Sequence, residues 1–356
     1  MNRNVLLHVT NKCNMHCMYC YNKDKSRHGE LQTSSIEGTN NLIRELQQQG
    51  DRIRLTLIGG EPSVVPNLCR ELIESMPYDR LQVMTNAYAW STVFKEALLY
   101  AKDRLQLTIS FDGLFQDLRK PDSTEYILKS IKWVREHNIR ANITCTCCPS
   151  HKGKVFDNLI YLTSFGLDVN YKRNCDHVLW EMQEDYQEVI KELGKAVHLA
   201  IYHGLLEDIC ISLPSRIEQG LSCTCAQRSG GFSCDEYVAN DIVIDVDGLV
   251  YPCEMYAAYG LHSLGHVCTL NAKTLLEKQD LFRCQKDKKA NVCPFYNEII
   301  TGDPTDCAVV NTTADARLWE YREHFDYLRN RINELTYVEQ LWTWGHIGTF
   351  AMSCLC

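Results

Sequence analysis

The stretch TNKCNMHCMYCYN, residues 10–22, decides how the rest of the chain is interpreted. Its three cysteines, Cys13, Cys17 and Cys20, have the spacing C-x3-C-x2-C, and no fourth cysteine stands in the same loop. A closed structural zinc site uses four ligands, whereas a thiolate-held iron cluster with three protein ligands keeps one iron open to another molecule. The loop therefore favours an iron–sulfur cluster. The alternative is a zinc knuckle whose fourth ligand comes from elsewhere in the chain.

Composition and charge exclude several classes of protein. The 356 residues are 45% hydrophobic and 23% charged, which suits a globular protein with one large domain and a smaller one, or with two joined domains. A formal net charge of -8 disfavours a nucleic-acid binder. Because no long apolar run and no signal-peptide pattern occur, we expect a cytoplasmic protein with no membrane partner. In that compartment, 19 cysteines indicate metal or redox chemistry rather than disulfides.

Strand-like and helix-like patterns alternate through the first half of the chain. Buried strands are predicted at 4–10, 52–60, 80–87, 105–113, 140–147 and 167–173, with amphipathic helices between them. Such alternation indicates a parallel sheet, and right-handed crossovers curl it into a partial or complete (β/α) barrel. Since barrel enzymes place their chemistry at the carboxyl ends of the strands, the residues that follow each strand become site candidates.

Distinct motifs stand at these strand ends. The three cysteines follow the first predicted strand and GGEP (59–62) follows the second, while TNA (85–87) and SFDG (110–113) end the third and fourth. Together these segments resemble the radical S-adenosylmethionine (SAM) superfamily. The resemblance implies an α/β fold with a partial (β/α)6 barrel and a [4Fe–4S] cluster on Cys13, Cys17 and Cys20. SAM would bind the open iron, and its reductive cleavage would give a 5′-deoxyadenosyl radical that abstracts a hydrogen atom.

The resemblance also implies the surroundings of SAM. The GGEP segment would hold the SAM amino group, with the Glu61 carboxylate facing the ammonium and the glycines allowing close approach. Tyr19 would approach the adenine, and Ser110 the ribose or carboxylate. The expected cofactor-binding residues are Tyr19, Gly59, Gly60, Glu61, Pro62, Asn86, Ser110, Asp112 and Arg173. The alternatives are a strand cap for Asn86, a surface ion pair for Arg173 and plain packing for Tyr19.

A second cysteine-rich region follows a helical stretch predicted at about 180–210. Cys234 and Cys253 enclose a segment in which Asp247-Gly248 predicts a β-hairpin, with the spacing C-x13-G-x4-C. This segment resembles the start of a SPASM or twitch domain, in which cysteines ligate an auxiliary [4Fe–4S] cluster. The ligands implied are Cys234, Cys253, Cys293 and Cys307, of which the last two follow from a looser match. Enough thiols remain for a second auxiliary cluster, and the roles of Cys223, Cys225, Cys268, Cys284, Cys354 and Cys356 stay open.

Four parts are expected along the chain. They are a radical SAM partial barrel at 1–178, a helical bridge at 179–220, a small SPASM/twitch-like auxiliary cluster domain at 221–312, and a C-terminal helix with a cysteine-containing tail at 313–356.

The resemblance implies an enzyme that modifies a peptide after translation, by a crosslink, a thioether, epimerisation or oxidation. Maturases of ribosomally made peptides and of anaerobic sulfatases are of this kind. The expected partners are a precursor peptide and a reductant such as flavodoxin or ferredoxin. One alternative is the same radical chemistry on a sugar, nucleoside or amino acid. Another is a non-catalytic iron–sulfur protein, which the GGEP and SFDG segments argue against; the substrate and the bond formed stay open.

Overall fold

The computed structural model describes residues 2–20, 22, 29–147, 149–173, 209–210, 241–252, 254–260 and 263–288. The chain divides into two compact units, each of which is built from segments that are distant in the sequence. The first unit comprises Met1–Ile109, Glu125–Arg140 and Ser229–Asn311, and the second comprises Ser110–Thr124, Ala141–Arg228 and Thr312–Cys356.

The first unit contains a mixed sheet with the strand order β10-β9-β8-β1-β2-β3-β4. The strands are β1 (Asn2–Thr10), β2 (Arg52–Gly59), β3 (Arg80–Thr85), β4 (Leu105–Ser110), β8 (Asp241–Ile244), β9 (Leu249–Tyr251) and β10 (Gly265–His266). Strands β8, β1, β2, β3 and β4 run parallel, whereas β9 and β10 are antiparallel to their neighbours. The carboxyl ends of β1, β2 and β3 therefore lie at the same edge of the sheet.

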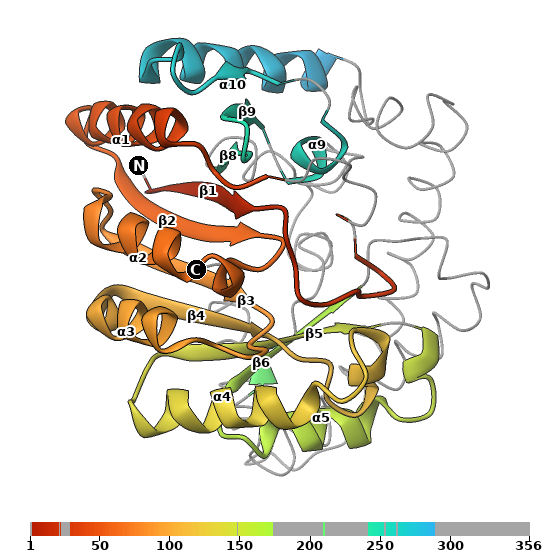
Figure 1. Cartoon of the computed structure of the whole chain (residues 1–356). Coiled ribbons are helices and arrows are strands. Elements are labelled where there is room, and N and C mark those ends of the chain that lie inside the picture. Colours follow the sequence, from red (N-terminus) through yellow and green to blue (C-terminus); the bar gives the residue numbers. More distant parts are fainter. Residues whose placement is uncertain are drawn as a thin grey trace, which may run out of the picture. The chain divides into compact units, whose positions relative to one another are not determined.

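Helices lie along one side of β1 to β4 (Figure 1). They are α1 (Thr33–Gln48), α2 (Pro66–Ser75), α3 (Thr92–Tyr100) and α4 (Thr124–Glu136), and the unit also contains α9 (Glu254–Tyr259) and α10 (Ala272–Lys288). Apolar residues at helical spacing on α1, such as Leu42 and Leu46, are buried, as are Leu55 and Leu57 on β2. None of the helices in the described part of the chain combines the length and apolar character that crossing a bilayer requires.

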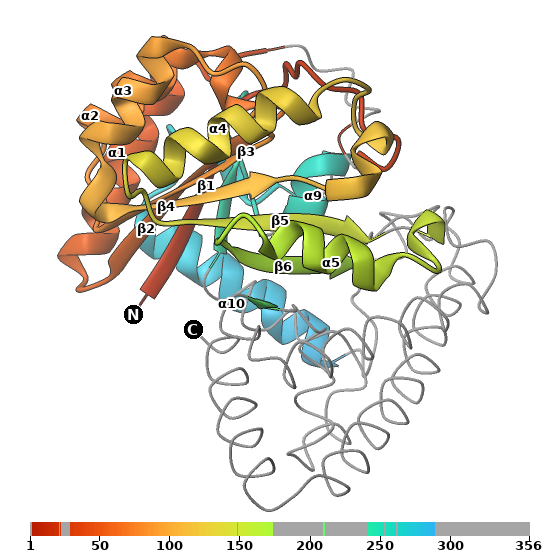
Figure 2. The same ribbon diagram turned by 90° about the horizontal axis from the view of Figure 1, so that it is seen from below.

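The second unit contains three parallel strands in the order β5 (Ala141–Cys147), β6 (Asp168–Arg173) and β7 (Ile209–Cys210). Helix α5 (Val155–Thr163) lies beside β5 and β6 (Figure 2). The rings of Phe111, Tyr161 and Phe165 contact one another, with centroids 5.1 to 6.3 Å apart. These aromatic contacts form the core between α5 and the segment that follows β4.

The six strands predicted in the first half of the chain are confirmed, with ends that shift by a few residues. The largest difference is in the fourth strand, which ends at Ser110 instead of 113. The third strand ends at Thr85 instead of 87. It ends there because the next backbone N–H, that of Asn86, donates to the Glu61 carboxylate, and Ala87 then adopts a φ of 56°. Of the predicted bridge at 179–220, the structure describes only the two residues of β7. The helix expected within 313–356 lies outside the described residues.

The predicted hairpin is confirmed, and β8 and β9 pair antiparallel through Val243 and Tyr251. Gly248 closes the turn with a φ of 80°, and its N–H donates to the Asp245 carbonyl at 2.8 Å. The structure adds a pairing that the sequence did not predict. Strand β8 runs parallel to β1, with Ile242 opposite Val5, so the hairpin of the 221–312 segment extends the N-terminal sheet.

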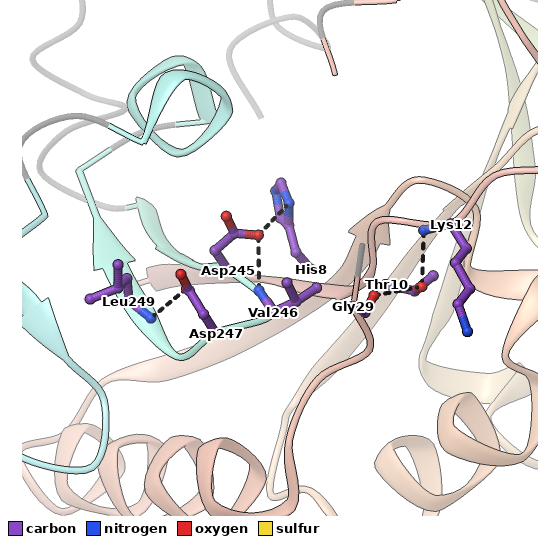
Figure 3. A network of polar contacts seen from close by, with 8 residues as sticks. All are labelled: His8, Thr10, Lys12, Gly29, Asp245, Val246, Asp247 and Leu249. Carbon is purple, nitrogen blue, oxygen red and sulfur yellow. Dashed lines mark hydrogen bonds and ion pairs between the residues drawn. The ribbon is translucent and has the colours of Figure 1, made fainter. Parts of the chain in front are cut away.

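A buried histidine–aspartate pair joins β1 to β8. His8 Nδ1 lies 3.5 Å from Asp245 Oδ1, and both side chains are fully buried (Figure 3). The same carboxylate accepts a hydrogen bond from the Val246 N–H at 2.9 Å, and Asp247 accepts one from the Leu249 N–H at 3.1 Å. Two aspartates thus hold the turn, and one of them also contacts the strand that leads to the cysteines.

Candidate active site

The cysteine loop leaves β1 through a fixed exit. The Thr10 hydroxyl donates to the Gly29 carbonyl and accepts from the Lys12 N–H, both at 3.1 Å (Figure 3). Farther along the loop, the Cys20 N–H donates to the Cys17 carbonyl at 3.2 Å, which closes a turn between these two cysteines. The loop is therefore held by its own backbone and by the segment at Gly29.

The surroundings of Cys13 change the pKa of its thiol. The pKa of Cys13 is raised to about 11, mainly by desolvation and also by the negative charges of Glu61, Cys17 and Cys20, although the hydrogen bond from the Met15 N–H acts in the opposite direction. The Met15 nitrogen is 3.4 Å from the Cys13 sulfur. Positive charge from iron would favour the thiolate that the surroundings disfavour.

The donor set of the loop fits an iron–sulfur cluster. Three thiols within one short loop are the ligand type that such clusters use. In the described part of the chain, no trio of His, Cys, Asp or Glu side chains is arranged as a ready metal site. The loop thus provides the right atoms, which still have to converge on the metal.

The glycines of the GGEP segment are required by the backbone of the cysteine loop. The Gly60 N–H donates to the Thr10 carbonyl at 2.7 Å, and the Glu61 N–H donates to the Lys12 carbonyl at 2.9 Å. A Cβ at Gly60 would lie 2.2 Å from the Lys12 oxygen, and one at Gly59 would lie 2.3 Å from the Thr10 oxygen. Only residues without a side chain allow this approach.

The Glu61 carboxylate connects the GGEP segment to the end of β3. It is 1% exposed and accepts hydrogen bonds from the Ser63 N–H at 3.0 Å, the Thr85 hydroxyl at 2.6 Å and the Asn86 N–H at 2.6 Å. Burial raises the pKa of Glu61, while these hydrogen bonds act in the opposite direction. Pro62 follows as the first residue of a short 3-10 helix, Pro62–Val64.

Asn86 follows the end of β3 and turns its side chain toward the cysteine loop. Its Nδ2 donates to Asn14 Oδ1 at 2.8 Å and lies 3.8 Å from the Cys13 sulfur. Its Oδ1 accepts from the Tyr88 N–H at 2.9 Å. Asn86, expected from the sequence to bind the cofactor, thus contacts the cysteine loop and the segment that follows β3, and all of these partners lie within the first unit. Tyr19, between Cys17 and Cys20, is partly exposed.

Ser110, Asp112 and Arg173 belong to the second unit. Ser110 ends β4 and is partly exposed. Asp112 is fully buried, accepts a hydrogen bond from the Thr146 N–H at 2.9 Å and lies 3.7 Å from Arg119, so its carboxylate holds the loop after β4. Arg173 ends β6. The proposed auxiliary ligands, Cys234, Cys253, Cys293 and Cys307, lie outside the described residues.

Two residues that are hydrogen-bonded to Glu61 or Asn86 were not predicted from the sequence. Thr85 and Asn14 contact Glu61 and Asn86, yet no spacing rule singles them out. The available signal was weak. Each stands beside a predicted residue, Thr85 before Asn86 and Asn14 after Cys13.

Sequence comparison identifies the domain that carries this site. Residues 7–160 match the sequence model of the Radical SAM superfamily. A cysteine-type anaerobic sulfatase-maturating enzyme of Clostridium perfringens strain 13 is 21% identical over 371 residues, which cover 90% of this chain and 94% of that enzyme. An uncharacterised protein of Methanocaldococcus jannaschii is 24% identical over 209 residues, which cover 54% of this chain and 72% of that protein.

Solved structures share the fold. Native anSMEcpe with bound AdoMet and Cp18Cys peptide has a TM-score of 0.66 at 17% identity, and the match covers 94% of this chain and 100% of that one. Streptococcus suis SuiB bound to the precursor peptide SuiA has a TM-score of 0.55 at 14% identity, over 77% of this chain and 64% of that one.

The chain carries a radical SAM domain and is a radical SAM enzyme. It is homologous to anaerobic sulfatase-maturating enzyme and thus related to maturases that modify peptides. This family implies SAM and a [4Fe–4S] cluster as cofactors.

Proposed function

We propose that the enzyme reductively cleaves SAM and uses the resulting 5′-deoxyadenosyl radical to abstract a hydrogen atom from a peptide, which it modifies. Cys13, Cys17 and Cys20 hold the cluster, which supplies the electron for cleavage when it is bound. The observation that carries this proposal is the junction of two motifs. The GGEP backbone donates to the Thr10 and Lys12 carbonyls, directly before the first cysteine. The segment proposed for SAM is thereby hydrogen-bonded to the backbone that leads into the cluster ligands.

The residues around the cysteines have separate proposed tasks. Glu61 places a negative charge beside the loop, which suits the SAM ammonium, although its oxygens already accept three hydrogen bonds. Asp112 has an indirect task, because its carboxylate accepts a hydrogen bond from the Thr146 N–H and so holds the loop after β4. The remaining positions proposed near SAM are Tyr19, Gly59, Gly60, Pro62, Asn86, Ser110 and Arg173.

The second part of the proposal is at least one auxiliary [4Fe–4S] cluster within the 221–312 segment, held by Cys234, Cys253, Cys293 and Cys307. Support comes from the hairpin, since β9 ends at Tyr251, two residues before Cys253. An auxiliary cluster could pass an electron to or from the substrate radical.

The proposed substrate is a peptide, and a cysteine-containing one is the first probe. Support comes from the cysteine-type sulfatase-maturating relative, whose similarity extends over 90% of this chain. The solved relatives anSMEcpe and SuiB are described with a Cp18Cys peptide and a precursor peptide, respectively. The proposed place of action is the cytoplasm, with flavodoxin or ferredoxin as reductant.

Anaerobic reconstitution tests the cluster assignment. We expect the Cys13/Cys17/Cys20→Ala variant to hold about four irons fewer per chain than the wild type and to form no 5′-deoxyadenosine with SAM and dithionite. Cys145→Ala is the control, since Cys145 is a buried cysteine of β5 outside the loop. Equal iron in the wild type and the triple variant, or a wild type that cannot cleave SAM, would contradict the proposal.

Mass spectrometry tests the substrate class. A short cysteine-containing peptide should accelerate 5′-deoxyadenosine formation and change in mass, while the same peptide with alanine in place of cysteine should do neither. If SAM is cleaved but the cysteine peptide neither accelerates cleavage nor changes in mass, the assignment to the cysteine-type class is wrong.

A further inference from the structure

We propose that Asn86 is a positioning residue for the cluster, and that its side-chain amide donates a hydrogen bond to the Cys13 sulfur and raises the cluster's reduction potential. The inference rests on the proposed function, because it takes Cys13 as a cluster ligand. It concerns the environment of the ligand sulfur, and it gives Asn86 a contact with the cysteine in addition to its proposed position near SAM.

Backbone groups fix which way the Asn86 amide points. Its Oδ1 is 2.9 Å from the Tyr88 nitrogen. A backbone N–H can only donate, so the amide oxygen must be the atom that faces it. The Nδ2 group therefore faces the opposite way, toward the cysteine loop.

The Asn14 side chain is oriented by the same residue. Its Nδ2 donates to the Tyr88 carbonyl at 3.2 Å, and a carbonyl can only accept. Asn14 Oδ1 therefore faces Asn86 and accepts one hydrogen of its Nδ2, at 2.8 Å. The N–H and the C=O of Tyr88 together fix which end of each side-chain amide, that of Asn86 and that of Asn14, is the oxygen and which is the NH2 group.

The second hydrogen of Asn86 Nδ2 is available to Cys13. The nitrogen lies 3.8 Å from the Cys13 sulfur, within the range for hydrogen bonds to sulfur. Asn86 is 5% exposed, and a buried donor needs a partner. Its backbone N–H is held by Glu61 at 2.6 Å, so the main chain of the residue is fixed as well.

A donor at a ligand sulfur has a predictable electronic effect. Hydrogen bonds to cluster sulfurs help set the reduction potential, and they favour the reduced state because it carries more negative charge. Cys13 has a second donor in the Met15 N–H at 3.4 Å, but substitution cannot remove a backbone group. Asn86 is therefore the side chain through which this potential can be altered.

Redox titration of the reconstituted full-length enzyme tests the proposal. The cluster is followed by the EPR signal that the Cys13/Cys17/Cys20→Ala variant lacks, which separates it from auxiliary clusters. Asn86→Leu should shift its midpoint potential to more negative values, and Asn86→Asp should shift it further. Asn67→Asp makes the same charge change at an exposed position of α2 and should leave the potential unaltered.

The outcomes separate this inference from the proposed function. If wild type and Asn86→Leu hold equal iron, both cleave SAM and share one potential, the role of Asn86 is refuted while the proposed function stands. If the wild type takes up no cluster on the three cysteines, both fail. Should Asn86→Leu not load iron, Asn86→Asp carries the test. It keeps an acceptor for the Tyr88 N–H but has no amide hydrogen to donate to Cys13, and an unchanged potential there overturns the proposal.

Discussion

Glu61 accepts a 2.6 Å hydrogen bond from the Thr85 hydroxyl, and both residues are almost fully buried. This contact links the turn after β2 to the end of β3. A carboxylate that is so little exposed to solvent needs hydrogen-bond donors from the protein, because burying a charge without partners costs free energy. The GGEP segment, which is hydrogen-bonded to the cysteine loop, is therefore held to the end of β3 by the contact between Thr85 and Glu61.

Replacing Glu61 with glutamine should destabilise the fold. Two of the three groups around the carboxylate are backbone N–H donors, and the new amide NH2 would confront at least one donor. We expect a loss of about 1–3 kcal/mol in the free energy of unfolding, measured by urea titration. Glu71→Gln, at an exposed position of α2, is the matched control. Equal stability of the two variants would show that the carboxylate is not needed as an acceptor.

Substituting Gly60 should disturb the cysteine loop. A methyl group there would lie 2.2 Å from the Lys12 carbonyl oxygen, so Gly60→Ala must push the loop away from the GGEP turn. We expect destabilisation on the order of 2 kcal/mol and reduced iron per chain after reconstitution. In Gly29→Ala, the added carbon would make an ordinary 3.6 Å contact with Val246, and iron loading should be retained.

Asp241 should make stability depend on pH. Its pKa is raised to about 7, mainly by burial and also by the charge of Glu254, although a hydrogen bond from Asn4 and the charge of Arg54 act in the opposite direction. The folded state therefore holds the proton more tightly than the unfolded chain, so stability is highest below about pH 4 for this group and falls as the pH rises toward 7.

Replacing Asp241 with asparagine removes this dependence. We expect Asp241→Asn to flatten the fall in the free energy of unfolding between about pH 4 and 7, a difference of roughly 2 kcal/mol after allowance for partial exposure. Denaturant titrations of both proteins across that range provide the measurement. Parallel pH profiles would show that the carboxyl group of Asp241 does not titrate between these values.

The His8–Asp245 contact should appear as a coupling energy. Single changes to leucine each remove one partner from a fully buried pair, and Asp245→Leu also removes the acceptor of the Val246 N–H. A double-mutant cycle isolates the shared part, which we expect to be about 0.5–3 kcal/mol. Effects that add within about 0.5 kcal/mol would mean that the two side chains stabilise their strands independently.

Local patterns were sufficient to predict the alternating strands and helices, because apolar periodicity depends on neighbours in the sequence. Local patterns could not predict that β8 pairs with β1, because the sequence of residues 241–244 does not indicate which distant strand it pairs with. The glycines of GGEP were predicted to allow close approach to SAM, and the group that approaches them in the structure is the Lys12 and Thr10 backbone. Thr85 and Asn14 were missed because their roles arise where strand ends meet.

The parallel pairing of β1 with β8 also bears on the order of events during synthesis. Val5 and Leu7 of β1 take their partners on one side from β2 and on the other from residues 242 and 244. Until the ribosome has made those later residues, one edge of the first strand has no neighbour, and open apolar edges invite aggregation. In a nascent chain that stops short of residue 241, this edge of β1 therefore stays open to aggregation. Dependence on chaperones should end when the β8–β9 hairpin has been made.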